Sequence, residues 1–305
     1  KMKIAVVGVT GLVGRKITEV LDERKLAVSS FVAVASEKSI GKKIMFQGKA
    51  HSVVSLRQAV DEKPDIAIFS AGRTNKNVPL VVSEINGEAL GKNDFIIANP
   101  NCSTIQLVMV LFPLHRKFKI KRVVVATYQS VTGSGAKGLR QIEAERQGKH
   151  SSAAYPHPIF NNVLPQAGEF VSDGYTSEEI KLINETRKIL NNNSLAIAVT
   201  AARVPVTGGH SEAVNIVFEK KFDLEDVYCY LREMPGVEVI DNPADSSYPM
   251  PIFTQGKDAV FVGRIRRDFS IKNGLNLWIT ADNLRKGAAT NTVQIAEILI
   301  EKGFF

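Results

Sequence analysis

Hydrophobic positions in the first hundred residues form short β-branched runs separated by segments with helical spacing. The first run, residues 3–8, is followed by a helically spaced apolar segment, and further runs lie at 31–35, 65–69 and 95–98. Continuous apolar runs of this length are typical of strands buried on both faces. The alternation of such runs with helical segments predicts an α/β domain with a doubly wound parallel sheet.

Composition narrows the class of protein. The 305 residues are 44% hydrophobic and 23% charged, as in a soluble globular protein, and no apolar run is long enough to span a bilayer. Because the chain opens on a strand-like run, we expect no signal peptide. Two cysteines cannot build a disulfide framework, so we expect a reducing cytoplasm and no membrane partner.

The net charge of +8 suits an anionic ligand. Basic residues cluster at 116–122 and 264–267, but neither cluster lies in a nucleic-acid-binding motif or among base-stacking aromatic residues. We therefore expect no nucleic-acid partner. No spacing of histidines and cysteines indicates a metal site.

A glycine-rich turn joins the first strand to the first helical segment. Gly8, Gly11 and Gly14 recur every third residue. Glycine permits a tight turn and lets backbone N–H groups approach a pyrophosphate at the helix N-terminus. Because the motif directly follows the first strand, it predicts a Rossmann-type dinucleotide site. The alternative is a glycine-rich turn that binds no ligand.

The residues after the second strand bear on the choice of cofactor. An NAD site usually has an acidic residue there, which holds the ribose hydroxyls. Here the chain continues Ser36-Glu37-Lys38-Ser39, and two hydroxyls with an ammonium suit a 2′-phosphate better, so we favour NADP. Glu37 argues for NAD unless it points to solvent. Lys38 as a plain surface charge is the alternative interpretation.

Cys102 follows the fourth predicted strand and a turn sequence at 99–101, and a helical apolar pattern begins directly after it. Pro100 prevents an earlier helix start, so we place Cys102 at a helix N-terminus, where the helix dipole favours the thiolate. Its polar neighbours argue against a buried structural cysteine, whereas Cys229 fits that description. A thiolate beside a nicotinamide indicates attack on an aldehyde or acyl donor, followed by hydride transfer.

A histidine is the expected partner of such a cysteine. Among the five histidines, His210 has the most suggestive setting, because a short strand carries Arg203 into a Gly-Gly turn that presents His210. Arginine binds carboxylates in bidentate fashion, and histidine exchanges protons near neutral pH. A histidine on a surface loop is the alternative.

Taken together, these strings resemble the aspartate-semialdehyde dehydrogenase family over nearly the whole chain. The cysteine string and the arginine–histidine string are specific at their relative positions, whereas the glycine string alone is not. The matching segments are residues 8–14, 99–104, 128–133, 178–181, 203–210 and 282–289.

The resemblance implies a role for each matching residue in the chemistry. Cys102 forms the acyl-thioester, His210 is the acid/base, and Gln129 orients the substrate or the intermediate. Backbone amides and the Asn101 side chain could stabilise the oxyanion. The residues implied to hold the carboxylate, amino group and phosphate of the substrate are Arg203, Glu178, Lys181 and Arg73.

The resemblance also implies cofactor contacts in three places. The pyrophosphate residues are Gly8, Thr10, Gly11, Leu12 and Val13. The 2′-phosphate residues are Ser36, Lys38 and Ser39. The residues on the nicotinamide side are Thr132, Gly133 and Asn283. The implied reaction reduces L-aspartyl-4-phosphate with NADPH to L-aspartate 4-semialdehyde and phosphate, as a step of amino-acid biosynthesis.

The family pattern further implies two domains. The NADP-binding domain comprises residues 1–101 and 286–305, and its last helical segment has an apolar stripe of Val293, Ala296 and Ile300 suited to packing on the sheet. The catalytic and dimerisation domain comprises residues 102–285 and is α+β. We expect a homodimer through this domain, with a tetramer as the alternative.

One departure from the family pattern is serious. After Gly72 the pattern continues through a helix and another strand before it reaches the phosphate-binding arginine, but here Arg73 follows at once. A true deletion would remove a central piece of the sheet. We therefore expect the natural chain to carry further residues between Gly72 and Arg73; if it does not, phosphate binding by Arg73 is in doubt.

Three other hypotheses about the function compete with an aspartate-semialdehyde dehydrogenase. The first is a related acyl-phosphate reductase, such as N-acetyl-glutamyl-phosphate reductase, against which the cysteine string and the Glu178/Lys181 pair argue. The second is a non-catalytic, nucleotide-sensing protein that binds NADP. The third is a nucleic-acid binder, suggested by the net charge.

Overall fold

The computed structural model describes residues 2–70, 78–149, 151 and 154–304. The chain divides into two compact units. Unit 1 comprises residues 1–99 and 288–305, and unit 2 comprises residues 100–287. The chain therefore leaves unit 1 after Asn99 and returns to it at Ala288, so that unit 1 is built from both ends of the sequence.

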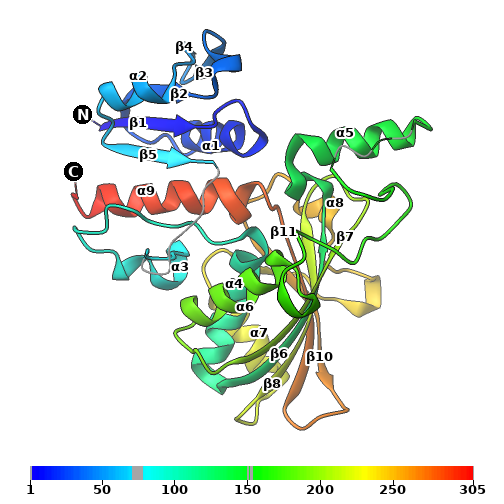
Figure 1. Ribbon diagram of the computed structural model, residues 1–305. Coiled ribbons are helices and arrows are strands. Elements are labelled where there is room, and N and C mark those ends of the chain that lie inside the picture. The colour runs from blue at the N-terminus through cyan, green and yellow to red at the C-terminus, as the bar shows by residue number, and fades with distance from the viewer. Residues whose placement is uncertain (1, 71–77, 150, 152–153, 305) are drawn as a thin grey trace. The chain divides into compact units, whose positions relative to one another are not determined.

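Unit 1 contains a three-stranded parallel sheet with the strand order β2-β1-β5 (Figure 1). Because parallel strands need a long crossover connection, helix α1 separates β1 from β2. The predicted α/β class with a parallel sheet is confirmed. The elements are β1 (Met2–Val7), α1 (Leu12–Glu23), β2 (Val28–Val34), β3 (Lys43–Phe46), β4 (Lys49–Ser52), α2 (Leu56–Asp61), β5 (Ile66–Phe69), α3 (Ser83–Asn86) and α9 (Asn291–Glu301).

The glycine turn after β1 allows α1 to approach the sheet closely. Gly8 has a left-handed φ of 84°, which glycine adopts without strain. A Cβ on Gly14 would overlap with the carbonyl oxygen of Gly8, so any side chain at Gly14 would push α1 away from the turn. The turn thus has the tight geometry that the glycine spacing predicts.

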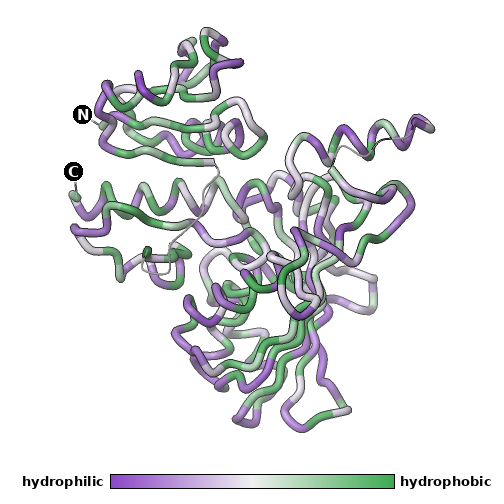
Figure 2. Tube along the Cα trace, viewed as in Figure 1, coloured by the Kyte–Doolittle hydropathy of each residue, from purple (hydrophilic) through white to green (hydrophobic). Residues whose placement is uncertain are grey.

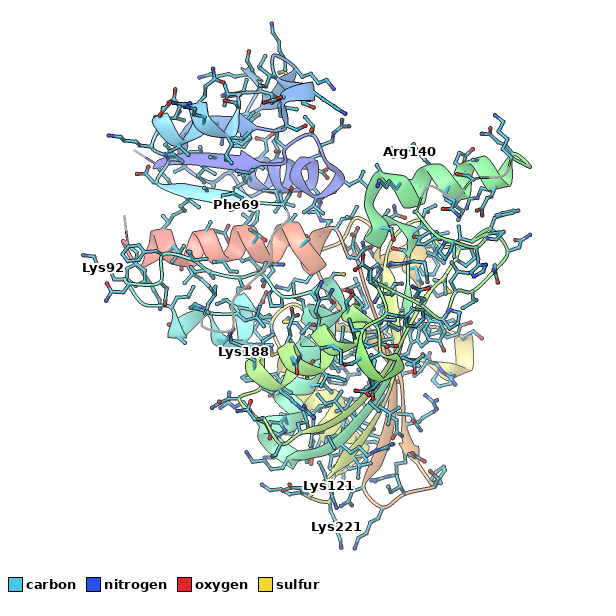
Figure 3. The ribbon with its side chains drawn as sticks, in the orientation of Figure 1. Phe69, Lys92, Lys121, Arg140, Lys188 and Lys221 are labelled. Atoms are coloured by element: carbon cyan, nitrogen blue, oxygen red, sulfur yellow. The ribbon has the colours of Figure 1, made fainter. Side chains whose placement is uncertain are left out.

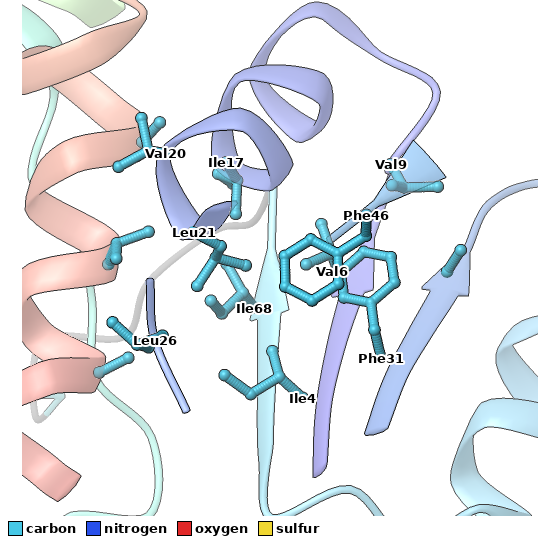
Figure 4. Close-up of a cluster of buried hydrophobic side chains, with 14 of the residues drawn as sticks. Ile4, Val6, Val9, Ile17, Val20, Leu21, Leu26, Phe31, Phe46 and Ile68 are labelled. Carbon is cyan, nitrogen blue, oxygen red and sulfur yellow. The ribbon is translucent and has the colours of Figure 1, made fainter. Parts of the chain in front are cut away.

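The hydrophobic core of unit 1 lies between the sheet, α1 and α9 (Figure 4). Ile17 and Leu21 of α1 and Val293 and Ala296 of α9 are at most 2% exposed. Ile300 is partly buried at the edge of the same cluster. The apolar stripe predicted on the C-terminal helix is therefore confirmed, and it packs within unit 1.

The strand predicted at 95–98 is wrong. Ala98 forms an isolated parallel bridge with Leu80, whereas Phe95 and Ile96 are 89% and 71% exposed. A parallel strand needs a hydrogen-bonded neighbour along its length, and among the described residues β5 pairs with β1 alone. The apolar run at 95–97 therefore has no strand beside it.

A cavity of about 290 Å³ in unit 1 is lined by β5, α9 and the segment 91–99. Its walls include Phe69, Phe95 and Ile295, and Phe69 on β5 (Figure 3) is 59% exposed. Exposed large apolar side chains beside a sheet edge usually mark a surface that another element covers. This supports a further βα unit between Gly72 and Arg73, two residues that lie outside the described part of the chain.

Intact-mass spectrometry of the natural protein tests this expectation. The 305-residue sequence has a mass of 33.4 kDa. We expect a clearly larger mass, because a strand and a helix are needed to cover the edge of β5. A measured mass of 33.4 kDa would show that the deletion is genuine.

Unit 2 contains a six-stranded mixed sheet with the order β7-β6-β8-β11-β10-β9. Helices α4, α6 and α7 pack on the same side of this sheet (Figure 1), and the strands beneath them are mostly hydrophobic (Figure 2). The helices are α4 (Cys102–Phe118), α5 (Gly135–Arg146), α6 (Ser177–Ile189), α7 (Leu224–Glu233) and α8 (Pro251–Thr254). The strands are β6 (Ile120–Gln129), β7 (Ala196–Arg203), β8 (His210–Phe218), β9 (Val237–Val239), β10 (Val260–Asp268) and β11 (Gly274–Ala281).

Candidate active site

The turn before α4 holds the candidate nucleophile. The helix begins at Cys102, as predicted, and Asn101 is its N-cap. The Oδ1 atom of Asn101 accepts hydrogen bonds from the backbone N–H groups of Ser103 at 2.9 Å and Thr104 at 3.3 Å. An asparagine cap of this kind satisfies amides that have no partner inside the helix. It also fixes the first turn, from which the half-buried Cys102 projects.

Two carboxylates of α6 hold Asn101 in place. Its Nδ2 donates to Oε1 of Glu178 at 2.6 Å, and its backbone N–H donates to Oε2 of Glu185 at 2.8 Å. The two glutamates are two helical turns apart and therefore lie on one face of α6. Sequence reasoning missed Glu185. The sequence feature that could have pointed to Glu185 is its position seven residues after Glu178, on the same face of the helix.

The end of β6 lies between Arg203 and His210. Arg203 ends β7 and His210 begins β8, and these two strands flank β6 in the sheet. Nη1 of Arg203 donates to the carbonyl oxygen of Ser130 at 2.9 Å, and the backbone N–H of Ser130 donates to Nδ1 of His210 at 3.1 Å. His210 is fully buried, so its interpretation as a surface-loop histidine is wrong.

Two buried nitrogens at this position have no hydrogen-bond partner among the described residues: Nε of Arg203 and Nε2 of His210. A Cβ on Gly133 would lie 2.5 Å from Nη1 of Arg203 and 3.1 Å from Nε2 of His210. Gly133 therefore packs directly against both side chains, and a larger residue there would have to move one of them. Buried polar atoms without partners are costly, so this pair is suited to receive a polar ligand.

Asn283 joins three segments of the site. Its Oδ1 accepts hydrogen bonds from Ser130 Oγ at 3.1 Å, from Thr132 Oγ1 at 3.2 Å and from the backbone N–H of Gly209 at 3.2 Å. Thr132 and Asn283, two of the residues expected on the nicotinamide side, therefore lie in one buried cluster with the residues that surround His210.

Gly287 lies directly against the candidate nucleophile. A Cβ on Gly287 would be 2.7 Å from Cβ of Cys102. The segment that contains Asn283 and Gly287 thus reaches both His210 and Cys102.

Gln129 and Glu212 are two further buried polar residues on the strands that carry the site. Gln129 is 1% exposed and donates from Nε2 to Thr127 Oγ1 at 3.2 Å. Strand register places Gln129 opposite Arg203 and Thr127 opposite Glu212, so these side chains share one face of the sheet. Glu212 is fully buried beside Gln106 of α4, and burial raises its pKa well above the usual range. Sequence reasoning missed Glu212.

The electrostatics of Cys102 differ from the sequence-based expectation. Burial, with a smaller contribution from Glu178, raises the pKa of the Cys102 thiol to about 12. The prediction of a thiolate is therefore wrong for the free protein, because desolvation outweighs the helix N-terminus and the charge of Arg203. Burial, together with Arg203, lowers the pKa of His210 to about 3. At neutral pH the two groups are a thiol and a neutral imidazole.

The pH dependence of alkylation tests this state of Cys102. A thiol pKa of about 12 means that the thiolate fraction of the free protein is small at pH 7 and increases with pH throughout the accessible range. We expect the rate of modification of Cys102 by iodoacetamide to rise about tenfold per pH unit between about pH 7 and 10. A rate that reaches a plateau near pH 7 would show that the cysteine is a thiolate already.

The residues expected at the pyrophosphate and the 2′-phosphate lie in unit 1, whereas those expected on the nicotinamide side lie in unit 2. Gly11 is the N-cap of α1, so no side chain caps the first backbone N–H groups of the helix. The first turn of α1 also has no acidic residue. Such a helix N-terminus beside a glycine turn fits a pyrophosphate. Ser36 and Lys38 are exposed after β2, whereas Ser39 is 8% exposed. A 2′-phosphate would therefore meet Ser36 and Lys38 more readily than the Ser39 side chain.

The remaining candidate residues are Arg73, Lys181 and Cys229. Arg73 lies outside the described residues. Lys181 on α6 has its side chain 57% exposed, with Nζ 4.0 Å from Oε2 of Glu178. Cys229 on α7 is exposed, so its interpretation as a buried structural cysteine is wrong.

In the described segments, no group of three or more histidines, cysteines and acidic residues could hold a metal ion. None of the helices described has the length and apolar character needed to cross a membrane.

Comparisons with known proteins show which family the chain resembles. Residues 3–74 match a family model described as semialdehyde dehydrogenase, NAD binding domain, and residues 111–286 match one described as semialdehyde dehydrogenase, dimerisation domain. An aspartate-semialdehyde dehydrogenase of Aquifex aeolicus is 45% identical over 99% of this chain and 98% of its own length. One of Campylobacter jejuni is 42% identical, with the same coverage of both chains. The Aquifex alignment spans 335 positions, so the relative has residues for which this chain has none.

Solved structures give the same result. Aspartate semialdehyde dehydrogenase II of Vibrio cholerae, in complex with ASA, superposes with a TM-score of 0.93 at 38% identity, covering 99% of this chain and 98% of that one. Aspartate semialdehyde dehydrogenase of Candida albicans, solved with NADP, gives a TM-score of 0.71 at 25% identity, covering 100% and 99% of the two chains.

Proposed function

Since the chain belongs to the aspartate-semialdehyde dehydrogenase family, we propose that it reduces L-aspartyl-4-phosphate with NADPH, through a thioester on Cys102, to L-aspartate 4-semialdehyde and phosphate. Membership in the family makes the chain an oxidoreductase of amino-acid biosynthesis with a domain for a nicotinamide cofactor. The proposal adds the identity of the cofactor, the covalent intermediate and the role of each residue.

The observation that carries the proposal is a pair of buried nitrogens, Nε of Arg203 and Nε2 of His210, that have no hydrogen-bond partner among the described residues. Both side chains pack against Gly133. A substrate carboxylate would satisfy the guanidinium in bidentate fashion, and a carbonyl or alkoxide oxygen would satisfy the imidazole. Both bonds would form in a desolvated setting, where charge-assisted hydrogen bonds are strong.

Cys102 is the proposed nucleophile. Its sulfur forms a bond to the carbonyl carbon of the acyl phosphate, and phosphate leaves with the bonding electron pair. Hydride cannot easily reduce a carboxylate, whereas a thioester carbonyl is electrophilic, so the covalent step makes reduction feasible. His210 is the proposed acid/base for the thiol and the hemithioacetal, and the buried Gln129 orients the intermediate. When bound, the nicotinamide supplies the hydride.

Glu178 and Asn101 act together in this proposal. Glu178 is the candidate for the substrate ammonium, yet in the free protein its carboxylate accepts a hydrogen bond from Asn101. An ammonium that pairs with Glu178 would compete for the same oxygen and would free the Asn101 amide to donate to the oxyanion at the helix N-terminus. Lys181 beside Glu178, with Arg73, is the proposed phosphate site.

The choice of NADP rests on the residues after β2. We expect kcat/KM to be higher with NADP than with NAD, because Ser36 and Lys38 are exposed donors at the position that holds the 2′-phosphate. Replacing Lys38 with alanine removes a charge-assisted hydrogen bond and should lower kcat/KM for NADP about tenfold while leaving NAD unchanged. The exposed Lys42 serves as a matched control. Equal losses with both cofactors would contradict this assignment.

We also propose a homodimer formed through unit 2. The family model that covers residues 111–286 is described as a dimerisation domain, which supports this arrangement and gives no support for a tetramer.

Phosphate-dependent reduction of NADP with aspartate semialdehyde tests the proposed function. We expect turnover that requires both phosphate and the four-carbon semialdehyde. N-acetyl-glutamate semialdehyde should be a poor substrate, because its acylated nitrogen carries no charge for Glu178. No turnover with aspartate semialdehyde would contradict the proposal.

A further inference from the structure

The ring of His210 has different surroundings at its two nitrogens. Nδ1 lies 3.1 Å from the backbone nitrogen of Ser130 and also 3.1 Å from Ser130 Oγ. Nε2 has no hydrogen-bond partner among the described residues, although the side chain is fully buried. Ser130 is therefore the residue that contacts the back of the imidazole, whereas the front packs against Gly133.

A backbone N–H can only donate a hydrogen bond, so the nitrogen that it faces must accept one. In the neutral imidazole, the nitrogen that accepts carries no proton, and the other nitrogen carries it. The geometry at Ser130 thus selects the form of His210 with its proton on Nε2. Burial and the charge of Arg203 hold the pKa of His210 at about 3, so the neutral ring is the form that matters at working pH.

The hydroxyl of Ser130 supports the other form. Its proton has acceptors in Oδ1 of Asn283 at 3.1 Å and Oγ1 of Thr132 at 2.8 Å, which leaves lone pairs of Oγ free toward Nδ1. The backbone N–H of Gly209 donates to Oδ1 of Asn283, which fixes the oxygen rather than the nitrogen of that amide toward Ser130. If Nδ1 becomes protonated, the backbone N–H of Ser130 loses its acceptor, and Ser130 Oγ is the atom positioned to accept from Nδ1–H.

From this arrangement we infer that Ser130 is a positioning residue that controls the protonation state of His210: its backbone N–H places the resting proton on Nε2, and its Oγ supports Nδ1–H when the ring takes up a second proton or changes tautomer. The inference rests on the proposed function, because it specifies which ring nitrogen of His210 carries the proton when His210 acts as acid or base.

The consequence for the reaction is an order of events. In the resting site, His210 offers a donor on Nε2 to the oxygen of the bound carbonyl, and the proton stays on the ring at this stage. A neutral imidazole can polarise a carbonyl in this way. Nε2 can accept the thiol proton of Cys102 only after the ring proton has moved from Nε2 to Nδ1, and in that form Ser130 Oγ is the partner of Nδ1. The change of tautomer therefore precedes deprotonation of the thiol. Ser130 thus takes part through His210 and does not touch the substrate itself.

Nitrogen NMR of protein labelled with ¹⁵N-histidine tests the resting tautomer directly. Chemical shifts separate protonated from unprotonated ring nitrogens, and the His210→Gln variant identifies the signals of His210 among the five histidines. At neutral pH we expect Nε2 protonated and Nδ1 unprotonated. The reverse pattern would overturn the inference. Because this measurement does not require turnover, its outcome is distinguishable from a failure of the proposed function.

The Ser130→Ala variant tests the hydroxyl. The backbone N–H remains, so the Nε2–H signal should persist, while kcat with aspartate semialdehyde should fall about tenfold or more with KM little changed, since a hydrogen bond to the transient Nδ1–H is lost. Ser211→Ala is the matched control. Ser211 is the buried neighbour of His210 in the chain, and its Oγ contacts Thr280. An unchanged kcat in Ser130→Ala, or an equal fall in Ser211→Ala, would contradict the role of Oγ.

Discussion

Replacing Cys102 with serine is expected to lower the rate of phosphate-dependent NADP reduction by at least ~100-fold, because an alcohol is a far poorer nucleophile than a thiol at neutral pH. The measurement is kcat/KM for aspartate semialdehyde at saturating phosphate and NADP. Cys229→Ser is the matched control: the same substitution at an exposed cysteine of α7 should leave kcat/KM unchanged. Cofactor binding should be unaffected in both variants.

An active Cys102→Ser variant would mean that hydride transfer proceeds without the thioester. It would then favour direct oxidation of a hydrated aldehyde, and Cys102 would be a structural residue at the start of α4. A wild-type protein that binds NADP but shows no turnover would instead favour the nucleotide-sensing alternative.

The second large effect is expected for Gly133→Ala. The new Cβ would lie 2.5 Å from Nη1 of Arg203 and 3.1 Å from Nε2 of His210, the two side chains proposed to bind the substrate. One of the two side chains must shift, and displacements of about 1 Å at a reacting centre cost on the order of 100-fold in rate. We expect kcat/KM to fall by about that factor, while the melting temperature changes little.

The control for this variant is Gly91→Ala in unit 1, where the nearest atom to the new Cβ is 3.6 Å away, an ordinary contact. It should leave both kcat/KM and the melting temperature unchanged. Full activity of Gly133→Ala would show that the reaction does not depend on the positions of Arg203 and His210. Loss of folding, rather than loss of activity alone, would show that Gly133 has a structural role.

The parts of the fold that the sequence predicts are those with local causes. The glycine turn and α1 follow from the spacing of Gly8, Gly11 and Gly14, and the start of α4 at Cys102 follows from Pro100 and the Asn101 cap. In each case residues within one turn determine the backbone conformation, so a short segment of sequence is enough to predict where the helix begins.

The parts that the sequence does not predict depend on distant contacts. The 95–98 run has the composition of a strand but lacks a neighbour with which to pair, and no local pattern reports that absence. The thiol of Cys102 is at a helix N-terminus, as its local sequence indicates, yet its pKa is raised by burial and by Glu178, which is 76 residues away in the chain. Burial therefore reverses the conclusion that the helix dipole alone supports.

Candidate residues were found where they carry recognisable chemistry and missed where they act on other residues. Arg203 and His210 stand out through the turn that separates them, and the structure brings both to the end of β6. Ser130 and Glu185 contact His210 and Asn101, and Glu212 is buried in the sheet, so their own sequence gives only weak signals. Ser130 lies next to Gln129 within a matching string, and that proximity was the available signal.

The charge-based alternative can be separated from the enzyme by salt dependence. A nucleic-acid binder would release counterions from DNA, and its affinity would fall steeply as salt increases. The basic residues at 116–122 and 264–267 lie in unit 2 on the end of α4 with the start of β6, and on β10, respectively. We expect only weak, nonspecific retention of DNA by these exposed surface charges.

The central claim is that the acyl group of the substrate is bonded to the sulfur of Cys102, and trapping that intermediate tests it most directly. The protein is incubated with aspartate semialdehyde and NADP in the absence of phosphate, and the modified peptide is then identified by mass spectrometry. We expect one aspartyl group on the peptide that contains Cys102, released when phosphate is added. Formation of NADPH with Cys102 unmodified, or an acyl group on any other residue, would contradict the claim.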